Sequence, residues 1–326
     1  MNKALKSIGI LAGLLAVGLG ALLVYVYQAL PYDDYPVFEP DNSAESVARG
    51  RYLANHVAVC VDCHSVRDWN YYSGPIVAGT EGRGGEVFDQ KLGFPGRFIA
   101  KNITPAALKD WKDVELARAI TSGVSRNGEP FFPVMPYPSY AKLSPSDLAA
   151  IVAYLRTLEP VEHTVQASRP DFPMNLIMRT IPSAHEPMKY DESDPVQYGK
   201  YLVTIGGCAD CHTPQEKGSR IPGMYLAGGF DFPLPDGSVV SSANITPDPD
   251  TGLGNWDENS FVQRFKSYAS GTVPEVGEGE KNTYMPWTMY AGMKEADLRA
   301  IYAYLRSVKP VHNAVDTFTP AAQSKP

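Results

Sequence analysis

The hydrophobic residues of this chain form two kinds of pattern. Residues 7–30 (SIGILAGLLAVGLGALLVYVYQAL) are an apolar run without a charged side chain. Such a run is long enough to cross a bilayer as a helix, which needs about 20 predominantly apolar residues. Further along, apolar residues recur every three or four positions over 148–158 and again over 298–308, as on the buried face of an amphipathic helix. We therefore expect one membrane-length helix followed by helical globular structure.

The N-terminal apolar run is interpreted as an uncleaved membrane anchor over residues 1–30. A secretory signal has a shorter apolar region of about 7–15 residues with a small-residue cleavage site after it, and no convincing site follows here. Lys3 and Lys6 precede the run while Asp33 and Asp34 follow it, so the positive-inside rule places the N-terminus in the cytoplasm. A cleaved signal peptide with a soluble product is the alternative. In either case the bulk of the chain is expected to be exported.

The chain also contains an internal repeat. MPYPSYAKLSPSDLAAIVAYLRTLEPV at residues 135–161 aligns without a gap with MPWTMYAGMKEADLRAIYAYLRSVKPV at residues 285–311, and GRYLANHVAVCVDCH aligns with GKYLVTIGGCADCH. Between these strings a short N-I-T-P element recurs, followed by Trp111 in the first copy and Trp256 in the second. Because the order is the same in both copies, we expect two homologous domains.

Local signals in both copies favour helices. N-caps are expected at Asn42 and Asp194, each opening a helix that runs into a C-x-x-C-H string, and Ser144 is expected to open the last helix of the first copy. The segments after the C-x-x-C-H strings are rich in Gly and Pro and favour loops. We therefore expect an all-α fold. Its expected parts are a transmembrane anchor over 1–30, a first domain over 31–160, a linker over 161–193, a second domain over 194–312 and a flexible tail over 313–326.

Length and composition exclude several classes of protein. At about 100 to 200 residues per domain, 326 residues allow two globular domains. A content of 44% hydrophobic and 20% charged residues argues against both intrinsic disorder and a membrane protein with many spans. The net charge of −7 argues against a nucleic-acid-binding protein, which would need a basic face.

The cysteines carry the candidate chemistry. All four lie in two C-x-x-C-H strings, which comprise Cys60, Cys63 and His64, and Cys208, Cys211 and His212. This is the spacing of c-type haem attachment: two thiols on one helical turn reach a haem edge, and the adjacent imidazole ligates the iron. A redox-active pair would not need a His in both copies, and a four-cysteine zinc site would not explain a repeated downstream Met. The strings therefore predict two covalently attached haem c groups.

A repeated methionine supplies the candidate for the sixth iron ligand. Met135 lies 71 residues after His64 and Met285 lies 73 residues after His212, and each is followed by Pro. Thioether sulfur is a common sixth ligand in cytochromes c and raises the potential. We therefore predict His64 and Met135 for the first iron, and His212 and Met285 for the second. The other histidines do not align between the copies and are interpreted as surface or structural residues: His56, His163, His185 and His312.

The repeated motifs together resemble a known family. C-x-x-C-H, N-I-T-P with a following Trp, M-P-x-x-x-Y-A and D-L-x-A-I-x-A-Y-L-R each occur twice. Over about residues 43–312, they resemble the multihaem cytochrome c subunits of bacterial membrane-bound alcohol and gluconate dehydrogenases. The resemblance implies tandem class I cytochrome c domains, covalent haem c, His/Met ligation at the positions above, and electron transfer from a dehydrogenase towards quinone or a terminal oxidase. Two features depart from the family: trihaem members have three C-x-x-C-H strings, and the anchor here is N-terminal.

The sequence thus predicts a membrane-anchored dihaem cytochrome c. It is expected to cross the bacterial cytoplasmic membrane once, with both haem domains on the periplasmic side. No catalytic residue is assigned, because the expected role is electron transfer and not enzyme catalysis. The expected partners are the membrane and redox proteins, namely a dehydrogenase, a quinol-oxidising complex or a terminal oxidase, within a larger membrane complex or outside one, and no nucleic acid.

The alternative is a dihaem cytochrome c peroxidase. Such an enzyme needs an open iron and an acid-base residue beside it, for which Glu129 or Glu278 are the candidates. Both copies carry the same Met-Pro, however, which favours two closed irons. A haem-based gas sensor would also need an exchangeable ligand, and the chain shows no output domain.

Overall fold

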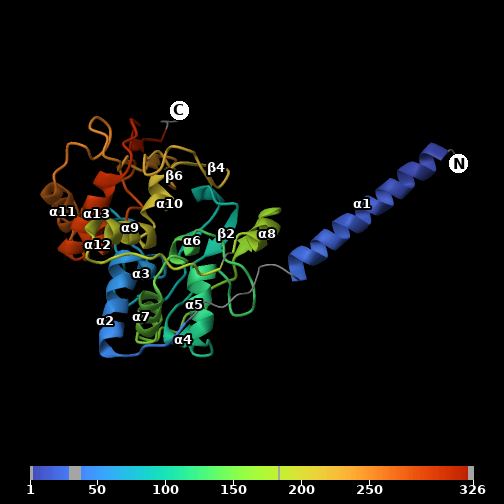
Figure 1. Cartoon of the computed structure of the whole chain (residues 1–326), viewed down its shortest axis with the longest axis horizontal. Coiled ribbons are helices and arrows are strands. Elements are labelled where there is room, and N and C mark those ends of the chain that lie inside the picture. The colour runs from blue at the N-terminus through green and yellow to red at the C-terminus, as the bar shows by residue number, and fades with distance from the viewer. Residues whose placement is uncertain (1–2, 29–37, 183, 322–326) are drawn as a thin grey trace.

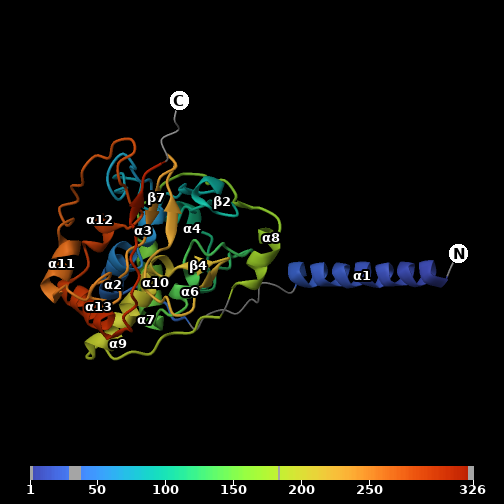
Figure 2. The same cartoon turned by 90° about the horizontal axis from the view of Figure 1, so that it is seen from above.

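The N-terminal helix stands apart from the rest of the chain. Helix α1 (Lys3–Gln28) extends away from a globular part that contains both copies of the repeat (Figures 1 and 2). Its Ala4–Gln28 stretch is long and apolar enough to cross a membrane, and none of its most apolar window is buried in the protein. The flanking acids Asp33 and Asp34 lie outside the described residues. The structure, a computed structural model, describes residues 3–28, 38–182 and 184–321.

The C-terminal end of α1 lies against the linker between the copies. The side-chain amide of Asn175 in α8 (Met174–Ile177) donates a hydrogen bond to the hydroxyl of Tyr27 (3.4 Å). The Arg179 guanidinium lies 4.9 Å from the centre of the Tyr27 ring. Arg179 also pairs with Glu129 of the first copy (2.6 Å), so the linker connects the end of α1 to the globular part.

The two copies contain corresponding helices in the same order. The first copy contains α2 (Ala44–Tyr52), the π-helix η1 (Leu53–Val57), α3 (Cys60–Cys63), α4 (Pro105–Leu108), α5 (Asp113–Ser122), α6 (Tyr137–Tyr140) and α7 (Pro145–Leu155). The second copy contains α9 (Pro195–Ile205), α10 (Cys208–His212), α11 (Glu258–Lys266), α12 (Trp287–Tyr290) and α13 (Glu295–Ser307). Two short 3₁₀ helices are η2 (Gln90–Leu92) and η3 (Met178–Thr180). The repeat pairs α2 with α9, α3 with α10, α5 with α11, α6 with α12 and α7 with α13.

Short antiparallel strands occupy segments that the sequence indicates as loops. Within the described residues they form three small sheets. The first contains β1 (Val87–Phe88), β2 (Gly96–Ile99) and β3 (Arg169–Pro170). The second contains β4 (Gln215–Glu216) and β5 (Ser219–Arg220), and the third contains β6 (Asp231–Pro233), β7 (Val239–Ser241) and β8 (Phe318–Thr319). The expectation of an all-α fold is therefore met only in part. Strands this short give no alternating pattern that would distinguish them from loops.

Strand pairing also orders segments outside the helical cores. In the linker, β3 pairs with β2, with Gly96 opposite Pro170. In the segment 313–326, where a flexible tail is expected, β8 pairs with β7, with Val240 opposite Phe318. In both cases the two paired strands lie far apart in the sequence, so the local composition of either segment does not predict the pairing. Residues 322–326 of the expected tail lie outside the described part of the chain.

The helix caps agree with the sequence at two places and differ at one. The side chains of Ser144 and Asp194 cap α7 and α9, as expected. Helix α2 is capped by Ser43, whose Oγ accepts a hydrogen bond from the N–H of Ser46 (3.2 Å), and not by Asn42. The prediction of Asn42 was wrong by one residue, because the helix begins at Ala44 and a cap side chain bonds the backbone two or three positions ahead.

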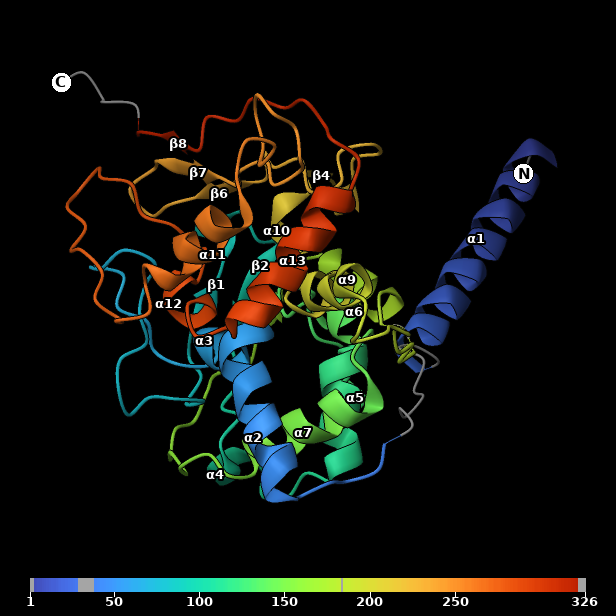
Figure 3. The ribbon, with the colours of Figure 1, turned by 60° about the vertical axis from the view of Figure 1, so that its left-hand side comes forward.

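The first and last helices of each copy cross at a glycine. An ideal Cβ on Gly50 in α2 would overlap the carbonyl oxygen of Ala150 in α7, and one on Gly199 in α9 would overlap that of Ala300 in α13. Backbones that approach this closely need a residue without a side chain. Both crossings can be followed in Figure 3. The aligned G-R-Y-L and G-K-Y-L strings therefore mark the crossing points.

One extra residue separates the two copies just before the cysteines. Gly50 and Gly199 align at an offset of 149, whereas Cys60 and Cys208 align at an offset of 148. The π-helix η1 lies within this interval in the first copy, where the second copy continues as α-helix. A single π-helical turn takes up one inserted residue. The cysteine helix can therefore follow the same course in both copies.

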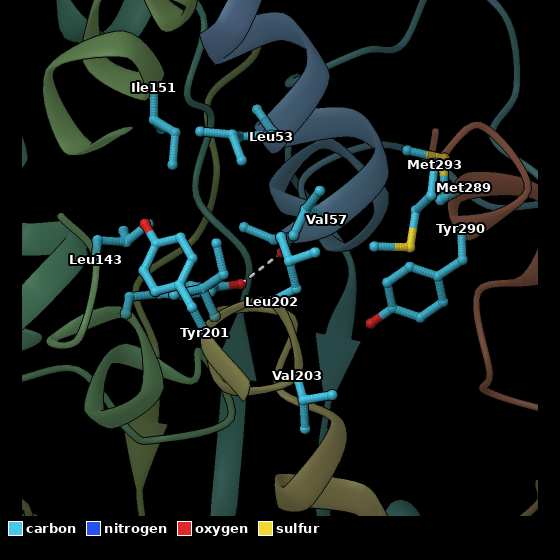
Figure 4. Packing of buried hydrophobic residues seen from close by; sticks show 14 of the residues in the cluster. Leu53, Val57, Leu143, Ile151, Tyr201, Leu202, Val203, Met289, Tyr290 and Met293 are labelled. Carbon is cyan, nitrogen blue, oxygen red and sulfur yellow. Dashed lines mark hydrogen bonds between the residues drawn. The ribbon is translucent and has the colours of Figure 1, made fainter. Parts of the chain in front are cut away.

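The two copies share one hydrophobic core. Its members shown in Figure 4 come from both copies and include Leu53, Val57, Leu143 and Ile151 from the first, and Tyr201, Leu202, Met289 and Tyr290 from the second. Each large apolar side chain that is fully buried contributes about 1.5–3 kcal/mol. The interface between the copies is therefore part of the folded core and not a loose contact.

Reciprocal hydrogen bonds cross this interface. Tyr52 at the end of α2 donates to Oδ2 of Asp297 in α13 (2.5 Å), and Tyr201 in α9 donates to Oδ2 of Asp147 in α7 (2.6 Å). Burial raises the pKa of both phenols, so each hydroxyl keeps its proton at neutral pH. Because the tyrosines align in the repeat and so do the aspartates, the interface has approximate twofold symmetry.

Replacing Gly50 or Gly199 with Ala is expected to destabilise the protein by roughly 1–3 kcal/mol, because the added methyl overpacks a contact made by backbone atoms. Helix propensity alone would stabilise these variants by about 1 kcal/mol, so a loss of stability would identify the backbone clash. The measurement is the midpoint of thermal unfolding of the holoprotein, followed by circular dichroism. Gly277→Ala is the control, because its Cβ would meet only the Glu280 side chain. An unchanged or raised midpoint in both crossing variants would contradict the close approach.

Removing the two interface hydroxyls is expected to have unequal effects. In Tyr201→Phe, Asp147 keeps its ion pair with Arg49 (2.8 Å), so the loss should be about 1 kcal/mol. Among the described residues, Tyr52 is the one side-chain donor to the buried Asp297 carboxylate, so Tyr52→Phe should cost about 2–3 kcal/mol. Urea unfolding measures the free energy of unfolding of both variants. A larger loss of stability in Tyr201→Phe than in Tyr52→Phe would contradict these hydrogen-bond assignments.

Candidate haem sites

The C-x-x-C-H strings form single helical turns, α3 and α10. The residue before each first cysteine lies in the left-handed region of backbone space: Val59 has a φ of 45° and Gly207 a φ of 65°. Glycine adopts this conformation at no cost, whereas a β-branched residue does so only where its surroundings require it. The same bend therefore turns the chain from the first helix into the cysteine turn in both copies.

The thiols do not have the pKa values of a reactive redox pair, and the four sulfurs do not gather as zinc ligands would. All four are free, and burial raises the pKa of Cys60, Cys63 and Cys208 to about 12, so these thiols keep their protons at neutral pH. The attacking thiols of redox pairs are thiolates with lowered pKa values. The four sulfurs also do not converge on one point where a metal ion could bind. Within the described ranges, the metal-ligating side chains that do converge are those of Asp248, Asp250 and His312.

Each C-x-x-C-H histidine is held by a carbonyl on the far side of its loop. The Nδ1–H of His64 donates to the carbonyl of Lys101 (2.6 Å), and that of His212 donates to the carbonyl of Ala243 (2.7 Å). Burial lowers the pKa of both imidazoles, which favours the neutral ring. With the proton on Nδ1, the lone pair of Nε2 is available for a metal, which is the usual arrangement of a ligating histidine.

A glycine closes the same loop in each copy. The N–H of Gly84 donates to the carbonyl of His64 (2.7 Å), and the N–H of Gly228 donates to that of His212 (2.8 Å). A Cβ on Gly84 would overlap the peptide bond between Lys101 and Asn102. A Cβ on Gly228 would overlap the peptide bond between Ala243 and Asn244. Both glycines have positive φ, so another residue would meet strain as well as a clash. The backbone around each imidazole is therefore tightly packed and equal in the two copies.

The repeated methionines lie in identical turns. The N–H of Tyr137 donates to the carbonyl of Met135 (2.7 Å), and the N–H of Trp287 donates to that of Met285 (2.8 Å). Both methionines are partly buried and pack against the hydrophobic core. The turns thus present two equivalent thioethers, each just before α6 or α12.

A tyrosine connects each methionine turn to the cysteine turn of the same copy. The hydroxyl of Tyr140 donates to the carbonyl of Ala58 (2.6 Å), and that of Tyr290 donates to the carbonyl of Gly206 (2.9 Å). Both carbonyls belong to the second residue before the first cysteine. The sequence reasoning did not identify this connection, although the Tyr of M-P-x-x-x-Y recurs in both copies.

One buried hydroxyl near Met135 lacks a partner within the described part of the chain. Tyr137 is fully buried, and its hydroxyl makes no hydrogen bond to any described residue. A buried phenol without a partner costs about 1–3 kcal/mol, so such groups usually have a function. The four paired thiols, the two oriented imidazoles and the two thioethers form a donor set that fits haem c.

The N-I-T-P element has a structural role. The Asn102 side chain accepts from the backbone N–H of Thr104 (2.9 Å) and donates to the carbonyl of Val161 (2.8 Å). Asn244 makes the equivalent bonds to Thr246 and to the carbonyl of Val311. The amide therefore ties the loop after each cysteine turn to the chain that follows the last helix. Both ends of each amide are thus occupied by protein partners.

The acidic residue inside each C-x-x-C-H string is paired with an arginine. Asp62 is buried and accepts from Arg67 (3.0 Å), which also pairs with Glu86 (2.8 Å). Burial raises the pKa of Asp62 to about 6, although Arg67 opposes the rise, so the carboxylate is ionised at neutral pH. Asp210 pairs with Arg220 (2.7 Å) at a more exposed position. Sequence reasoning missed these pairs, because the arginines do not align.

The remaining candidate groups have other partners. The His56 Nδ1–H donates to the carbonyl of Met289 (2.8 Å) across the interface, and the Nε2–H of His185 donates to the carbonyl of Leu143 (2.9 Å). His312 lies 3.5 Å from Asp248, and His163 lines an interdomain cleft. The Glu129 carboxylate, proposed for a peroxidase, pairs with Arg179 at the linker. Glu278 lies in the lining of the same cleft.

The two cysteine turns lie close to the interface between the copies. The hydroxyl of Ser139 in α6 donates to Oδ2 of Asp210, inside the second C-x-x-C-H string (2.7 Å). The pKa of Tyr290 is raised well above its usual value, chiefly by burial, and the negative charge of Asp62 in the other copy adds to the rise. Each turn is therefore adjacent to residues of the other copy.

Comparison with known proteins agrees with this description. Residues 47–159 and 196–309 each match the cytochrome c family. These two regions contain the corresponding helices of the two copies, including both cysteine turns and both methionine turns.

Several relatives are named as cytochromes or as cytochrome subunits. The cytochrome c subunit of alcohol dehydrogenase (quinone) from Gluconacetobacter polyoxogenes is 28% identical over 299 residues, covering 86% of this chain and 59% of that protein. The gluconate 2-dehydrogenase cytochrome c subunit from Pantoea cypripedii is 30% identical, covering 84% and 62%. A diheme cytochrome c-type protein from Cereibacter sphaeroides is 30% identical, covering 77% and 82%.

The chain thus spans about three fifths of the length of the two dehydrogenase subunits and most of the diheme cytochrome. Both family matches together cover more than half of the chain. This chain therefore belongs to the cytochrome c family, with two cytochrome c domains in tandem and covalently bound haem c.

Proposed function

We propose that the chain is a dihaem electron-transfer protein with one haem c in each domain. Cys60 and Cys63 would hold the first haem through thioether bonds, and Cys208 and Cys211 would hold the second. The observation that carries the proposal is the repeated histidine geometry: each imidazole donates from Nδ1 to a carbonyl and leaves Nε2 available. Two equal ligand arrangements favour two haems of the same kind.

His64 and Met135 are proposed as ligands of the first iron, and His212 and Met285 as ligands of the second. A haem bound in this way supplies a reversible one-electron change at its iron. The residues around it do no bond chemistry. The carbonyl partners orient each imidazole, the tyrosines hold each methionine turn against its cysteine turn, and the apolar core keeps water out.

We propose that electrons pass between the two domains. Ser139 of the first domain contacts Asp210 within the second cysteine turn, and the core runs across the interface without a break. A shared core holds the two sites at one separation, so electrons can pass between the domains without a diffusive step. This supports one continuous path through the protein.

The proposed electron donor is a dehydrogenase. The relatives include cytochrome subunits named for alcohol, gluconate and fructose dehydrogenases, as well as one of the subunits of a nicotinate dehydrogenase. These donors oxidise different substrates, so we propose the class of partner and not its substrate. The proposed acceptor is a quinone-linked complex or a terminal oxidase.

The proposed location is the outer face of the bacterial cytoplasmic membrane. Helix α1 has the length and composition of a membrane span, and a signal sequence would pass the same test. The lysines before it favour a cytoplasmic N-terminus. We propose that α1 remains attached, with haem domains over 31–160 and 194–312 and a linker over 161–193 on the periplasmic side.

The spectrum of the purified holoprotein tests the number and ligation of the haems. Two low-spin haems are expected, with the weak near-infrared band of ferric iron bound to a thioether and no reaction with carbon monoxide or peroxide, because both irons have six ligands. A high-spin haem that binds carbon monoxide or consumes peroxide would instead favour the peroxidase.

Replacing Met135 or Met285 with Ala tests each sixth ligand. Each variant is expected to lose half of the near-infrared band, to bind carbon monoxide at one haem and to lower one potential by on the order of 0.1 V, since axial ligands tune haem potentials over about 0.8 V. Potentiometric titration and absorption spectra measure these changes. Met174→Ala in the linker is the control. A variant with both the band and the potentials unchanged removes that methionine from the ligand set.

A further inference from the structure

A turn of the first domain lies on the methionine turn of the second. The turn comprises residues 69–74 (WNYYSG), and we call residues 282–287 (NTYMPW) the Met285 loop. The N–H of Tyr72 donates to the carbonyl of Pro274 (2.9 Å), and the N–H of Val276 donates to the carbonyl of Asn70 (2.8 Å). The two segments are therefore joined by backbone hydrogen bonds beside the Met285 loop.

The Ser73 hydroxyl bonds the backbone on both sides of Pro286. It donates to the carbonyl of Met285 (2.7 Å) and accepts from the N–H of Trp287 (2.9 Å). Ser73 is 1% exposed, so water does not compete for these bonds. One side chain of the first domain thus holds the turn that carries the proposed ligand of the second iron.

Asn282 fastens the turn from the opposite side. Its Oδ1 accepts from the backbone N–H of Ser73 (2.9 Å), and its Nδ2 donates to the carbonyls of Trp69 (3.1 Å) and Tyr71 (3.3 Å). Asn282 is itself buried. The contact is therefore reciprocal: each segment contributes one polar side chain that satisfies backbone groups of the other.

The conformation of Ser73 shows how strongly the contact constrains it. Its φ of 69° lies in the left-handed region, which a residue other than glycine adopts only when surrounding contacts require it. The next residue, Gly74, has a φ of 53°, and a Cβ there would come within 2.8 Å of the Trp69 ring. Aromatic contacts complete the junction, since Trp69 packs edge-on against Tyr284 at 5.1 Å between ring centres.

The methionine turn of the first domain is supported differently. It has the same internal bond from Tyr137 to Met135. Within the described ranges, however, no side chain of the second domain bonds the Met135 carbonyl or the Tyr137 N–H. The reason is visible in the sequence: the segment from the histidine to the closing Gly-Gly pair is shorter in the second copy, 213–229 against 65–85 in the first. At the corresponding place the second copy has the shorter β4–β5 hairpin in place of the 69–74 turn.

We propose that Ser73 is a positioning residue for Met285, so that ligation of the second haem iron depends on docking of the first domain. The inference rests on the proposed function, in which Met285 is the sixth ligand. A thioether is a neutral ligand on a loop, and loops open more readily than helices. The Ser73 hydroxyl limits that opening at the second haem. The first methionine turn meets the other domain one helical turn later, where Ser139 bonds Asp210, and within the described residues no side chain of that domain bonds the Met135 carbonyl.

The test compares Ser73→Ala and Ser73→Gly in the holoprotein. Both variants remove the hydroxyl, but glycine also relieves the left-handed backbone, so a shared effect belongs to the hydroxyl. The hydroxyl makes two buried hydrogen bonds, and the loss of each changes an equilibrium by about fivefold, so the fraction of ferrous second haem that binds carbon monoxide should rise by at least about that factor. The matching redox wave should move to lower potential.

Met285→Ala and Met135→Ala assign the two waves, because each variant moves one of them. The expected result is that the Ser73 variants change only the wave that responds to Met285→Ala. Ser267→Ala is the control, since it removes an exposed serine hydroxyl of the second domain, the domain of Met285, that bonds the carbonyl of Arg264. It should change neither wave.

The two proposals fail in distinguishable ways. If Met285→Ala leaves the near-infrared band and both waves unchanged, Met285 is not a ligand and the proposed ligation fails. If Met285→Ala removes part of the band while both Ser73 variants bind no more carbon monoxide than the parent, the ligation stands and the positioning role is overturned. Equal shifts of both waves in the Ser73 variants also overturn it, because a general loss of structure would then explain the result.

Discussion

The close crossing of the first and last helices in each domain is the constraint on which the other features depend. It is possible only because Gly50 and Gly199 have no side chain to separate the backbones. The first helix leads into the cysteine turn, and the last helix follows the methionine turn and its short helix, α6 or α12. Fixing the crossing therefore fixes both proposed iron ligands relative to each other. The tyrosine of each M-P-x-x-x-Y string then connects the two turns with a single buried hydrogen bond.

The same helices build the interface between the domains. Tyr52 and Tyr201 follow the crossing glycines by two residues, and each hydroxyl reaches the first turn of the other domain's last helix. The apolar groups around them belong to one core that includes both domains. An electron carrier gains from such an arrangement, because a rigid separation between two redox sites does not depend on chance encounters. The interface and the ligand turns are thus products of one packing arrangement.

Twofold symmetry between the domains is approximate, and the departures lie near the ligands. The first domain has the π-helix η1, the strained residue Val59 and the 69–74 turn, whereas the second has α-helix, Gly207 and a shorter segment. Two haems in identical surroundings would have equal potentials. The Ser73 contact holds the Met285 turn but has no equivalent at Met135 among the described residues. This difference could give the two haems different potentials.

The sequence by itself determined the repeat, the two haem-attachment strings, the positions of the main helices and the proposed ligands, because these depend on local periodicity and on spacing within each copy. It placed one cap a residue early at Asn42, and it did not predict the strands, whose runs are too short to show a pattern. Only the tertiary structure decided which carbonyl orients each histidine, that the N-I-T-P asparagine is a structural tie, and that Ser73 bonds the backbone of Met285 from 212 residues away. These contacts join segments of different copies or distant loops, and their geometry is set by packing that no local pattern of residues describes.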